Sequence, residues 1–213
     1  MSISICIMGA SGAGKTTSLR NLPPAETIYI DCDKKGLSWK GWRENFCDAN
    51  KNYFKTDDPA QILRWINTIS KERPNVHYIV IDTLNGIMWG EDNRKRKEKG
   101  YDKFVDLAGN VYDILEAANM LRDDIFVIMT AHTEEETDSG YVFTHIKTCG
   151  KKLGKIIPES KINCVLHAKR NEEGFYVFET HAHNSTAKTP LGMFDEEEIT
   201  NDITIVLEEF KKY

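Results

Sequence analysis

One short stretch near the start of the chain carries the residue types that hold a triphosphate. The pattern G-x-x-x-x-G-K-[ST] is matched without a mismatch by Gly9, Ala10, Ser11, Gly12, Ala13, Gly14, Lys15 and Thr16. Glycines let backbone N–H groups approach an anion closely, and Lys15 would reach the β- and γ-phosphates. The Thr16 hydroxyl would ligate Mg²⁺, and Thr17 continues the same nucleotide-binding segment. The stretch predicts a site for ATP and Mg²⁺; the alternative is a glycine-rich turn without a ligand.

Acidic residues follow two of the predicted strands. Asp31 and Asp33 come directly after an apolar run at 27–30, and Asp82 lies at the end of another at 76–83. In open α/β sheets the carboxyl ends of strands gather around the ligand. We therefore predict that Asp82 holds Mg²⁺ through water and that Asp33 polarises an attacking water. The alternatives are a strand-end cap for Asp82 and ordinary loop acids for Asp31 and Asp33.

A histidine stands at the corresponding point of a third strand. The apolar run 125–132 ends at His132, at the level where a γ-phosphate would lie. A side chain at that position can sense the phosphate and pass its presence to the next loop. The alternative is that His132 caps its own turn.

The elements that must position these residues alternate between strand and helix patterns. Strands are expected at residues 3–8, 27–30, 76–83, 125–132, 141–147, 162–168 and 175–180. Helices are expected directly after the glycine-rich loop, from Asp58-Pro59 onward, over about 101–122 and over 202–212, with a short basic helix at 150–157. The segment 34–58 is irregular, the chain changes character over 84–100, where no helix or strand is assigned, and 133–140 is acidic and predicted to be mobile. For the aromatic residues in 34–58, packing is the expected role and stacking on adenine is the alternative.

The overall charge argues against a uniformly basic nucleic-acid coat. The 213 residues include 28 Lys and Arg and 33 Asp and Glu, for a formal charge of −5. A local basic cluster is nevertheless formed by Arg94, Lys95, Arg96, Lys97 and Lys99. It is either a phosphate-backbone contact for DNA or a solvated charged segment.

Cysteine usage and hydropathy point to one cellular setting. The five cysteines show no C-x-x-C pair, which suggests reduced thiols. The sequence has no signal-peptide pattern and no apolar run long enough to span a bilayer. We predict a cytoplasmic protein without a membrane partner, in a single domain over 1–213.

Taken in order, these features resemble a RecA-type ATPase core, and more closely the small RecA-like ATPases of bacteriophages, including the family of single-strand annealing proteins. The likeness covers nearly the whole chain and is carried by the stretches IMGASGAGKTTSL, YIVIDTLNGI, VIMTAH and AKTPLGMF. The resemblance implies an α/β fold: a P-loop NTPase with a RecA-like core, a mostly parallel central sheet flanked by helices, and a C-terminal β-meander.

The resemblance also implies an activity and roles for residues. The expected function is Mg²⁺-dependent ATP hydrolysis on single-stranded DNA in phage recombination or replication, in the host cell cytoplasm. Asp33 would stand where RecA proteins have the glutamate that activates water, and His132 would replace the glutamine that senses the γ-phosphate. Lys188 would match a lysine that reaches the neighbouring subunit's nucleotide, which implies a homo-oligomer, a ring or a filament. The loops 89–100 and 133–150 would match two DNA-facing loops, and a single-strand-binding protein would be a further partner.

Two other functions stay open at this point. One is an ATP-binding adaptor or loader with little hydrolysis, which the departures at Asp33 and His132 allow. The other is a small-molecule kinase, for which the basic cluster at 94–99 would form a lid over the phosphates.

Overall fold

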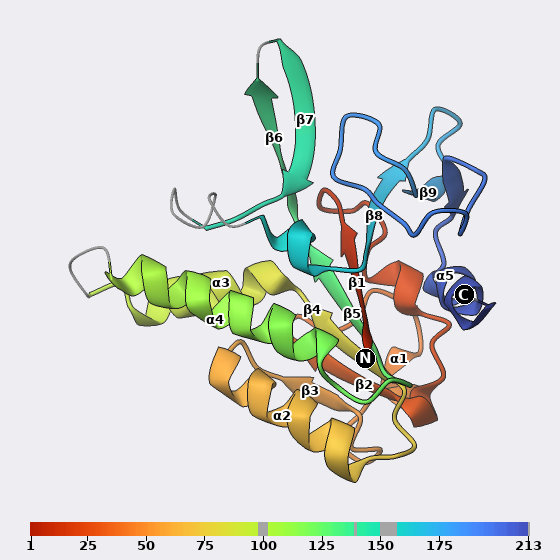
Figure 1. The fold of residues 1–213 in the computed structure, drawn as a ribbon. Coiled ribbons are helices and arrows are strands. Elements are labelled where there is room, and N and C mark those ends of the chain that lie inside the picture. The colour runs from red at the N-terminus through yellow and green to blue at the C-terminus, as the bar shows by residue number, and fades with distance from the viewer. Residues whose placement is uncertain (98–101, 139, 150–156, 213) are drawn as a thin grey trace.

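The computed structural model describes residues 1–97, 102–138, 140–149 and 157–212, and its centre is an eight-stranded sheet (Figure 1). The strands lie in the order β10-β9-β8-β1-β5-β4-β2-β3, and all the pairs from β8 to β3 are parallel. Their bounds are β1 (Ile3–Met8), β2 (Thr27–Asp31), β3 (Tyr53–Lys55), β4 (Tyr78–Asp82), β5 (Phe126–Ala131), β8 (Cys164–Arg170), β9 (Tyr176–Glu179) and β10 (Glu198–Thr200). Because β8, β9 and β10 pair antiparallel in sequence order, they form a C-terminal meander. The predicted fold class is confirmed.

The central strands read as continuous apolar runs because both faces of the sheet are covered. Along β1, Cys6 and Met8 face one hydrophobic cluster, whereas Ile5 and Ile7 face the other. Successive side chains of a strand point to opposite faces, so a strand buried on both sides has no polar alternation. This arrangement fixes the carboxyl ends of the parallel strands at one edge of the sheet.

Helices supply the two covering layers. One face packs against α2 (Pro59–Glu72), α3 (Leu84–Arg94) and α4 (Asp102–Asn119). The other face packs against α5 (Ile203–Lys212) and the segments that contain the short helices η1 (Thr17–Leu19) and α1 (Trp42–Asn45). Two further 3₁₀ turns are η2 (Pro24–Glu26) and η4 (Pro158–Lys161). Among the described helices, none has the length and apolar character needed to cross a membrane.

The predicted helix after the glycine-rich loop is wrong in type and length. The chain makes only the three-residue 3₁₀ turn η1 before Pro23 and Pro24. The Lys15 carbonyl accepts a hydrogen bond from Ser18 Oγ (2.6 Å), and the amide of Leu19 turns instead to the carbonyl of Thr16 (3.2 Å). A side-chain hydroxyl therefore competes with the α-helical pattern from the first turn. The short turn leaves little helix dipole, so loop N–H groups and Lys15 must do most of the anion binding.

Three segments without a predicted helix or strand are ordered elements. The segment 34–58 contains α1 and β3, and residues 84–94 form α3. The acidic segment predicted to be mobile forms β6 (Thr133–Asp138), which pairs antiparallel with β7 (Tyr141–Ile146). This hairpin is separate from the main sheet and projects from the body of the molecule (Figure 1). Backbone hydrogen bonds between the two strands order a sequence whose composition alone favoured a loop.

The outcome can also be given for the short helix expected at 150–157 and for the strand expected at 175–180. The short basic helix expected at 150–157 falls almost entirely on residues outside the described part of the chain. The strand expected at 175–180 is observed as β9 and ends at Glu179.

Candidate active site

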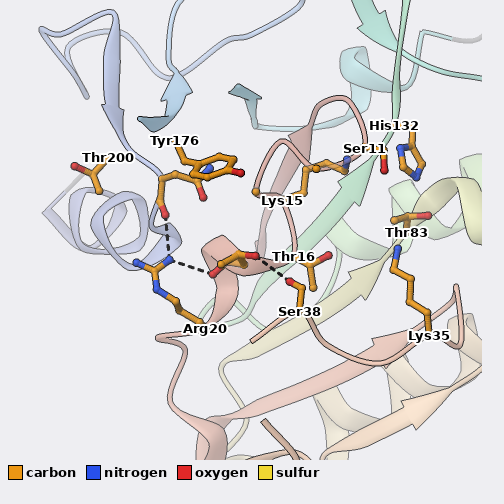
Figure 2. Close-up of a pocket in the computed structure, with 14 residues that line it drawn as sticks. Ser11, Lys15, Thr16, Arg20, Lys35, Ser38, Thr83, His132, Tyr176 and Thr200 are labelled. Carbon is orange, nitrogen blue, oxygen red and sulfur yellow. Dashed lines mark hydrogen bonds between the residues drawn. The ribbon is translucent and has the colours of Figure 1, made fainter. Parts of the chain in front are cut away.

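A pocket of about 500 Å³ lies at the sheet edge where the carboxyl ends of β1, β2, β4 and β5 meet (Figure 2). Ligand sites of proteins typically have volumes in this range. The glycine-rich loop runs along the pocket floor, and side chains from distant parts of the chain surround it. The lining residues are Ser11, Gly12, Gly14, Lys15, Thr16, Thr17, Arg20, Lys35, Ser38, Thr83, His132, Tyr176, Thr200 and Asn201.

Three glycines of the loop are required by its geometry. Gly12 and Gly14 have φ of +80° and +91°, a left-handed conformation that costs glycine little. Gly9 faces the carbonyl of Ala168 on β8, which would lie 2.5 Å from a Cβ at that position. The loop is therefore held open and close to the sheet, with its main chain exposed to a ligand.

Lys15 is buried beneath the loop. Its ammonium donates to the carbonyl oxygens of Gly9 (2.7 Å) and Ala10 (2.8 Å). The pKa of Lys15 is lowered from 10.5 to about 8, mainly by burial; the nearby charge of Asp82 opposes this shift and that of Lys35 adds to it. A triphosphate would offer this ammonium stronger acceptors than two neutral carbonyls.

The lowered pKa predicts how nucleotide affinity depends on pH. Phosphates bind the charged ammonium, so affinity should be level below pH 8 and fall above it, by up to about tenfold per pH unit. Binding above pH 8 should take up a proton, because the phosphates raise the pKa of Lys15. Titration calorimetry in buffers of different ionisation enthalpy measures this uptake. If the affinity for the nucleotide does not change between pH 7 and 9.5 and binding takes up no proton, the assignment of Lys15 to the phosphates is contradicted.

Asp82, at the end of β4, is buried and held by three hydroxyl groups. Its Oδ2 accepts hydrogen bonds from Thr16 Oγ1 (2.9 Å) and Tyr29 Oη (2.5 Å), and Oδ1 accepts one from Thr130 Oγ1. The Thr16 hydroxyl and the Asp82 carboxylate are hard oxygen donors, the kind that Mg²⁺ prefers. The pair fits a metal held directly by Thr16 and through water by Asp82.

The two acids after β2 have different surroundings. Asp31 is buried, and its Oδ2 accepts hydrogen bonds from Tyr53 Oη (2.6 Å) and the amide of Gly36 (2.8 Å), so it shapes the loop. Asp33 is only partly buried and accepts from Lys35 Nζ (2.5 Å) and Thr83 Oγ1 (3.0 Å). Since both of these partners line the pocket, the Asp33 carboxylate lies directly behind the side chains that form the pocket wall.

His132 lines the pocket beyond the end of β5. Its backbone is fixed by the fully buried Asn85 of α3, whose Oδ1 accepts from the His132 amide (2.7 Å) and whose Nδ2 donates to the carbonyl of Lys147 (2.8 Å). The ring stacks on Trp89, with centroids 5.7 Å apart. Burial and the nearby charge of Lys15 lower the pKa of His132, which favours a neutral imidazole at pH 7. The histidine thus connects the pocket to α3 and to the base of the β6–β7 hairpin.

The remaining predicted residues lie away from the pocket. Lys188 is exposed, and its backbone forms a bridge with Val165 of β8. In the basic cluster, Arg94 is ion-paired with Asp57 (2.8 Å), and Lys95 with Asp106 (2.9 Å). Both side chains also contact Glu91. Arg96 and Lys97 are exposed, and Lys99 lies outside the described residues.

Several lining residues were not found by sequence reasoning. Lys35 could have been found, since it follows Asp33 by two positions. Arg20, Tyr176, Thr200 and Asn201 give no such signal, because nothing in their local sequence indicates a ligand. The aromatic residues of 34–58, considered for adenine stacking, do not line the described pocket. Trp42, Phe46 and Tyr53 of that segment are buried in the core instead.

Comparison with known proteins gives one finding. A search of curated proteins gives no match. The family model described as "AAA domain" matches residues 1–191, which include the glycine-rich loop and every strand of the sheet up to β9. The chain therefore belongs to the AAA domain family, whose members are in general nucleotide-binding ATPases.

Proposed function

We propose that this chain is a Mg²⁺-dependent ATPase that acts on single-stranded DNA in phage recombination or replication. The observation that supports hydrolysis best is that Lys15 and Thr16 line the pocket while Asp82 and Asp33 lie directly behind it, hydrogen-bonded to the lining residues Thr16 and Lys35. Lys15 and Thr16 come from the glycine-rich loop, Asp82 from the end of β4 and Asp33 from the segment after β2. Together they offer a cation, a metal site and a carboxylate to one triphosphate.

The first step is capture of the phosphates. Loop N–H groups surround the phosphate oxygens, and Lys15 moves from the carbonyls of Gly9 and Ala10 to the β- and γ-phosphates. Thr16 and Asp82 would hold Mg²⁺, which when bound neutralises charge on the phosphate oxygens. Because Asp82 is already fixed by Tyr29 and Thr130, the site needs little rearrangement at this carboxylate.

The second step is attack by water on the γ-phosphorus, in which the bond to the β–γ bridging oxygen breaks and ADP leaves. Asp33 is the carboxylate that orients this water and accepts its proton. In the structure its partner is the Lys35 ammonium, which itself lines the pocket. An incoming γ-phosphate competes for Lys35, and the transfer of Lys35 to the phosphate frees Asp33 for water. Neutral His132 can donate a hydrogen bond to the same phosphate and so report its presence to the hairpin that begins at Thr133.

The proposed DNA partner has separate support. The β6–β7 hairpin starts directly after His132, so a nucleotide-dependent shift of the histidine would move it. Arg96 and Lys97 are exposed and available to phosphates, whereas Arg94 and Lys95 are already engaged with acids of the protein. Exposure of Lys188 outside its own pocket is consistent with a role on the nucleotide of a neighbour in a homo-oligomer.

Phosphate release with and without single-stranded DNA tests this function. We expect ATP hydrolysis that requires Mg²⁺ and is stimulated by DNA. An Arg96→Ala/Lys97→Ala variant should bind DNA more weakly, and the slope of log affinity against log salt should be smaller by about 1.4, because each lost contact to a single-stranded phosphate removes about 0.7. An Arg64→Ala/Lys71→Ala variant removes equal charge from α2 and serves as the control.

Other results would point to another function or would remove the two basic side chains from DNA binding. Release only in the presence of a small acceptor would identify a kinase. Tight ATP binding without release would identify an adaptor or loader. An unaltered salt slope in the Arg96→Ala/Lys97→Ala variant would exclude these two side chains from DNA binding.

A further inference from the structure

The end of the pocket opposite the proposed hydrolysis groups carries a second set of polar and aromatic residues. In Figure 2, Tyr176 and Thr200 lie on one side of the loop, and His132, Thr83 and Lys35 lie on the other. We propose that this end is a nucleobase subsite in which Asn201 selects adenine and Tyr176 stacks on the base. The inference rests on the proposed function, because it takes the phosphates to lie on the glycine-rich loop.

The orientation of the nucleotide in the pocket follows from which residues lie at each of its two ends. The γ-phosphate must lie near Asp33, Thr83 and His132 for water to attack it. The triphosphate then runs along the loop past Lys15, and the nucleoside emerges at the other end. Tyr176 and Asn201 lie directly over the loop there: a Cβ on Gly14 would be 3.1 Å from Tyr176 Cδ1 and 3.0 Å from Asn201 Oδ1.

Asn201 is built as a recognition group. The residue is only 5% exposed, and its side-chain Nδ2 is buried without a hydrogen-bond partner among the described residues. Its backbone is fixed, because the amide donates to the carbonyl of Tyr176 (3.3 Å) and the carbonyl accepts from Arg20 Nη1 (3.3 Å). Buried amide groups in native proteins are nearly always paired, so an unpaired one that lines a pocket calls for a ligand partner.

The chemistry of the amide favours one base. A carboxamide offers one acceptor and two donors in a plane, and it matches the N7 acceptor and N6 donor of adenine in a bidentate pair. Guanine presents N7 and O6, both acceptors, so the carboxamide oxygen would face O6 without a proton between them. We therefore expect this site to bind ATP more tightly than GTP.

Tyr176 provides the apolar surface. Its side chain is half exposed on β9, and the guanidinium of Arg170 lies 5.3 Å from the ring centroid, which helps to hold the ring in place. Stacking on an aromatic ring stabilises any base, whereas the amide discriminates between bases. The two residues therefore make separable contributions, affinity from Tyr176 and selectivity from Asn201.

The test compares Mg²⁺-dependent binding of ATP, GTP and inorganic tripolyphosphate, which has the phosphates but no base. The wild-type chain should bind ATP about tenfold or more tightly than GTP, and GTP more tightly than tripolyphosphate. Asn201→Ala should bring the ATP to GTP ratio close to one and leave tripolyphosphate binding unchanged. Tyr176→Ala should weaken ATP and GTP together by about tenfold or more, again without effect on tripolyphosphate.

Matched controls separate these effects from damage to the fold. Phe175→Ala removes the neighbouring exposed ring, which does not line this pocket, and Asn75→Ala removes an exposed amide on another loop. Both should bind like the wild type. An ATP to GTP ratio unchanged by Asn201→Ala, or a parallel loss of tripolyphosphate binding, would overturn the base assignment. A wild-type chain that binds neither nucleotides nor tripolyphosphate would instead refute the proposed function, and the subsite with it.

Discussion

Replacement of Lys15 by alanine is expected to weaken ATP binding by about 100-fold or more. The variant loses a buried ammonium that would donate to two phosphates, and charged hydrogen bonds of this kind are worth about 1.5–3 kcal/mol each. A loss of about 3 kcal/mol corresponds to roughly a 100-fold change in dissociation constant. Titration calorimetry with Mg²⁺ and a non-hydrolysable ATP analogue measures the effect directly.

The same variant should fold normally. Since burial lowers the pKa of Lys15 to about 8, the protein already bears a desolvation cost for this charge, and its removal should not lower the melting temperature. Lys40→Ala removes an exposed lysine of the loop after β2 and is the matched control. Equal ATP affinity in Lys15→Ala and Lys40→Ala would refute the nucleotide site.

Replacement of Asp33 by asparagine is expected to slow ATP hydrolysis by about 100-fold or more, the usual range for a lost general base. Asparagine preserves the shape and can still accept from Thr83, but it cannot take a proton from water. ATP affinity should be retained or slightly higher, because one negative charge near the phosphates is removed and Lys35 is released. Single-turnover phosphate release, together with equilibrium binding, separates the two effects.

Two comparisons make the Asp33 result specific. Asp48→Asn removes an exposed acid from the same long segment after β2 and should hydrolyse ATP like the wild type. A Lys35→Met variant should bind ATP more weakly, because it lacks the cation that the γ-phosphate is proposed to attract. Unchanged hydrolysis in Asp33→Asn would mean that another group activates the water.

The site residues that could be predicted from the sequence belong to patterns of a few neighbouring residues. The glycine-rich loop has fixed spacing, and Asp82 and His132 each end an apolar run that reads as a buried strand. Parallel strands buried on both faces must place such residues at one edge, so the sequence was enough to bring them together. The helix after the loop was misjudged because a hydroxyl contact, Ser18 to the Lys15 carbonyl, competes with the expected hydrogen-bond pattern.

Helix α3 shows why some elements were missed. Its Gly86 and Gly90 weaken the helical signal, yet both are required by packing. A Cβ on Gly86 would lie 2.6 Å from Asp33 Oδ1, and one on Gly90 would collide with Asp57. The glycines that obscure the helix in the sequence are the ones that let it pack closely against the loops beside the pocket.

The sequence by itself determined the phosphate loop, the strand-end acid and histidine, and the parallel sheet that gathers them, because each is encoded within a few neighbouring residues. Only the tertiary structure decided which side chains of the basic cluster are ion-paired within the protein and which residues line the rest of the pocket. Arg94 is neutralised by Asp57, 37 positions away, and Asn201 meets Gly14 across nearly the whole chain. Strand order and helix packing determine these partners. Both depend on contacts between residues far apart in the sequence, which no local pattern predicts.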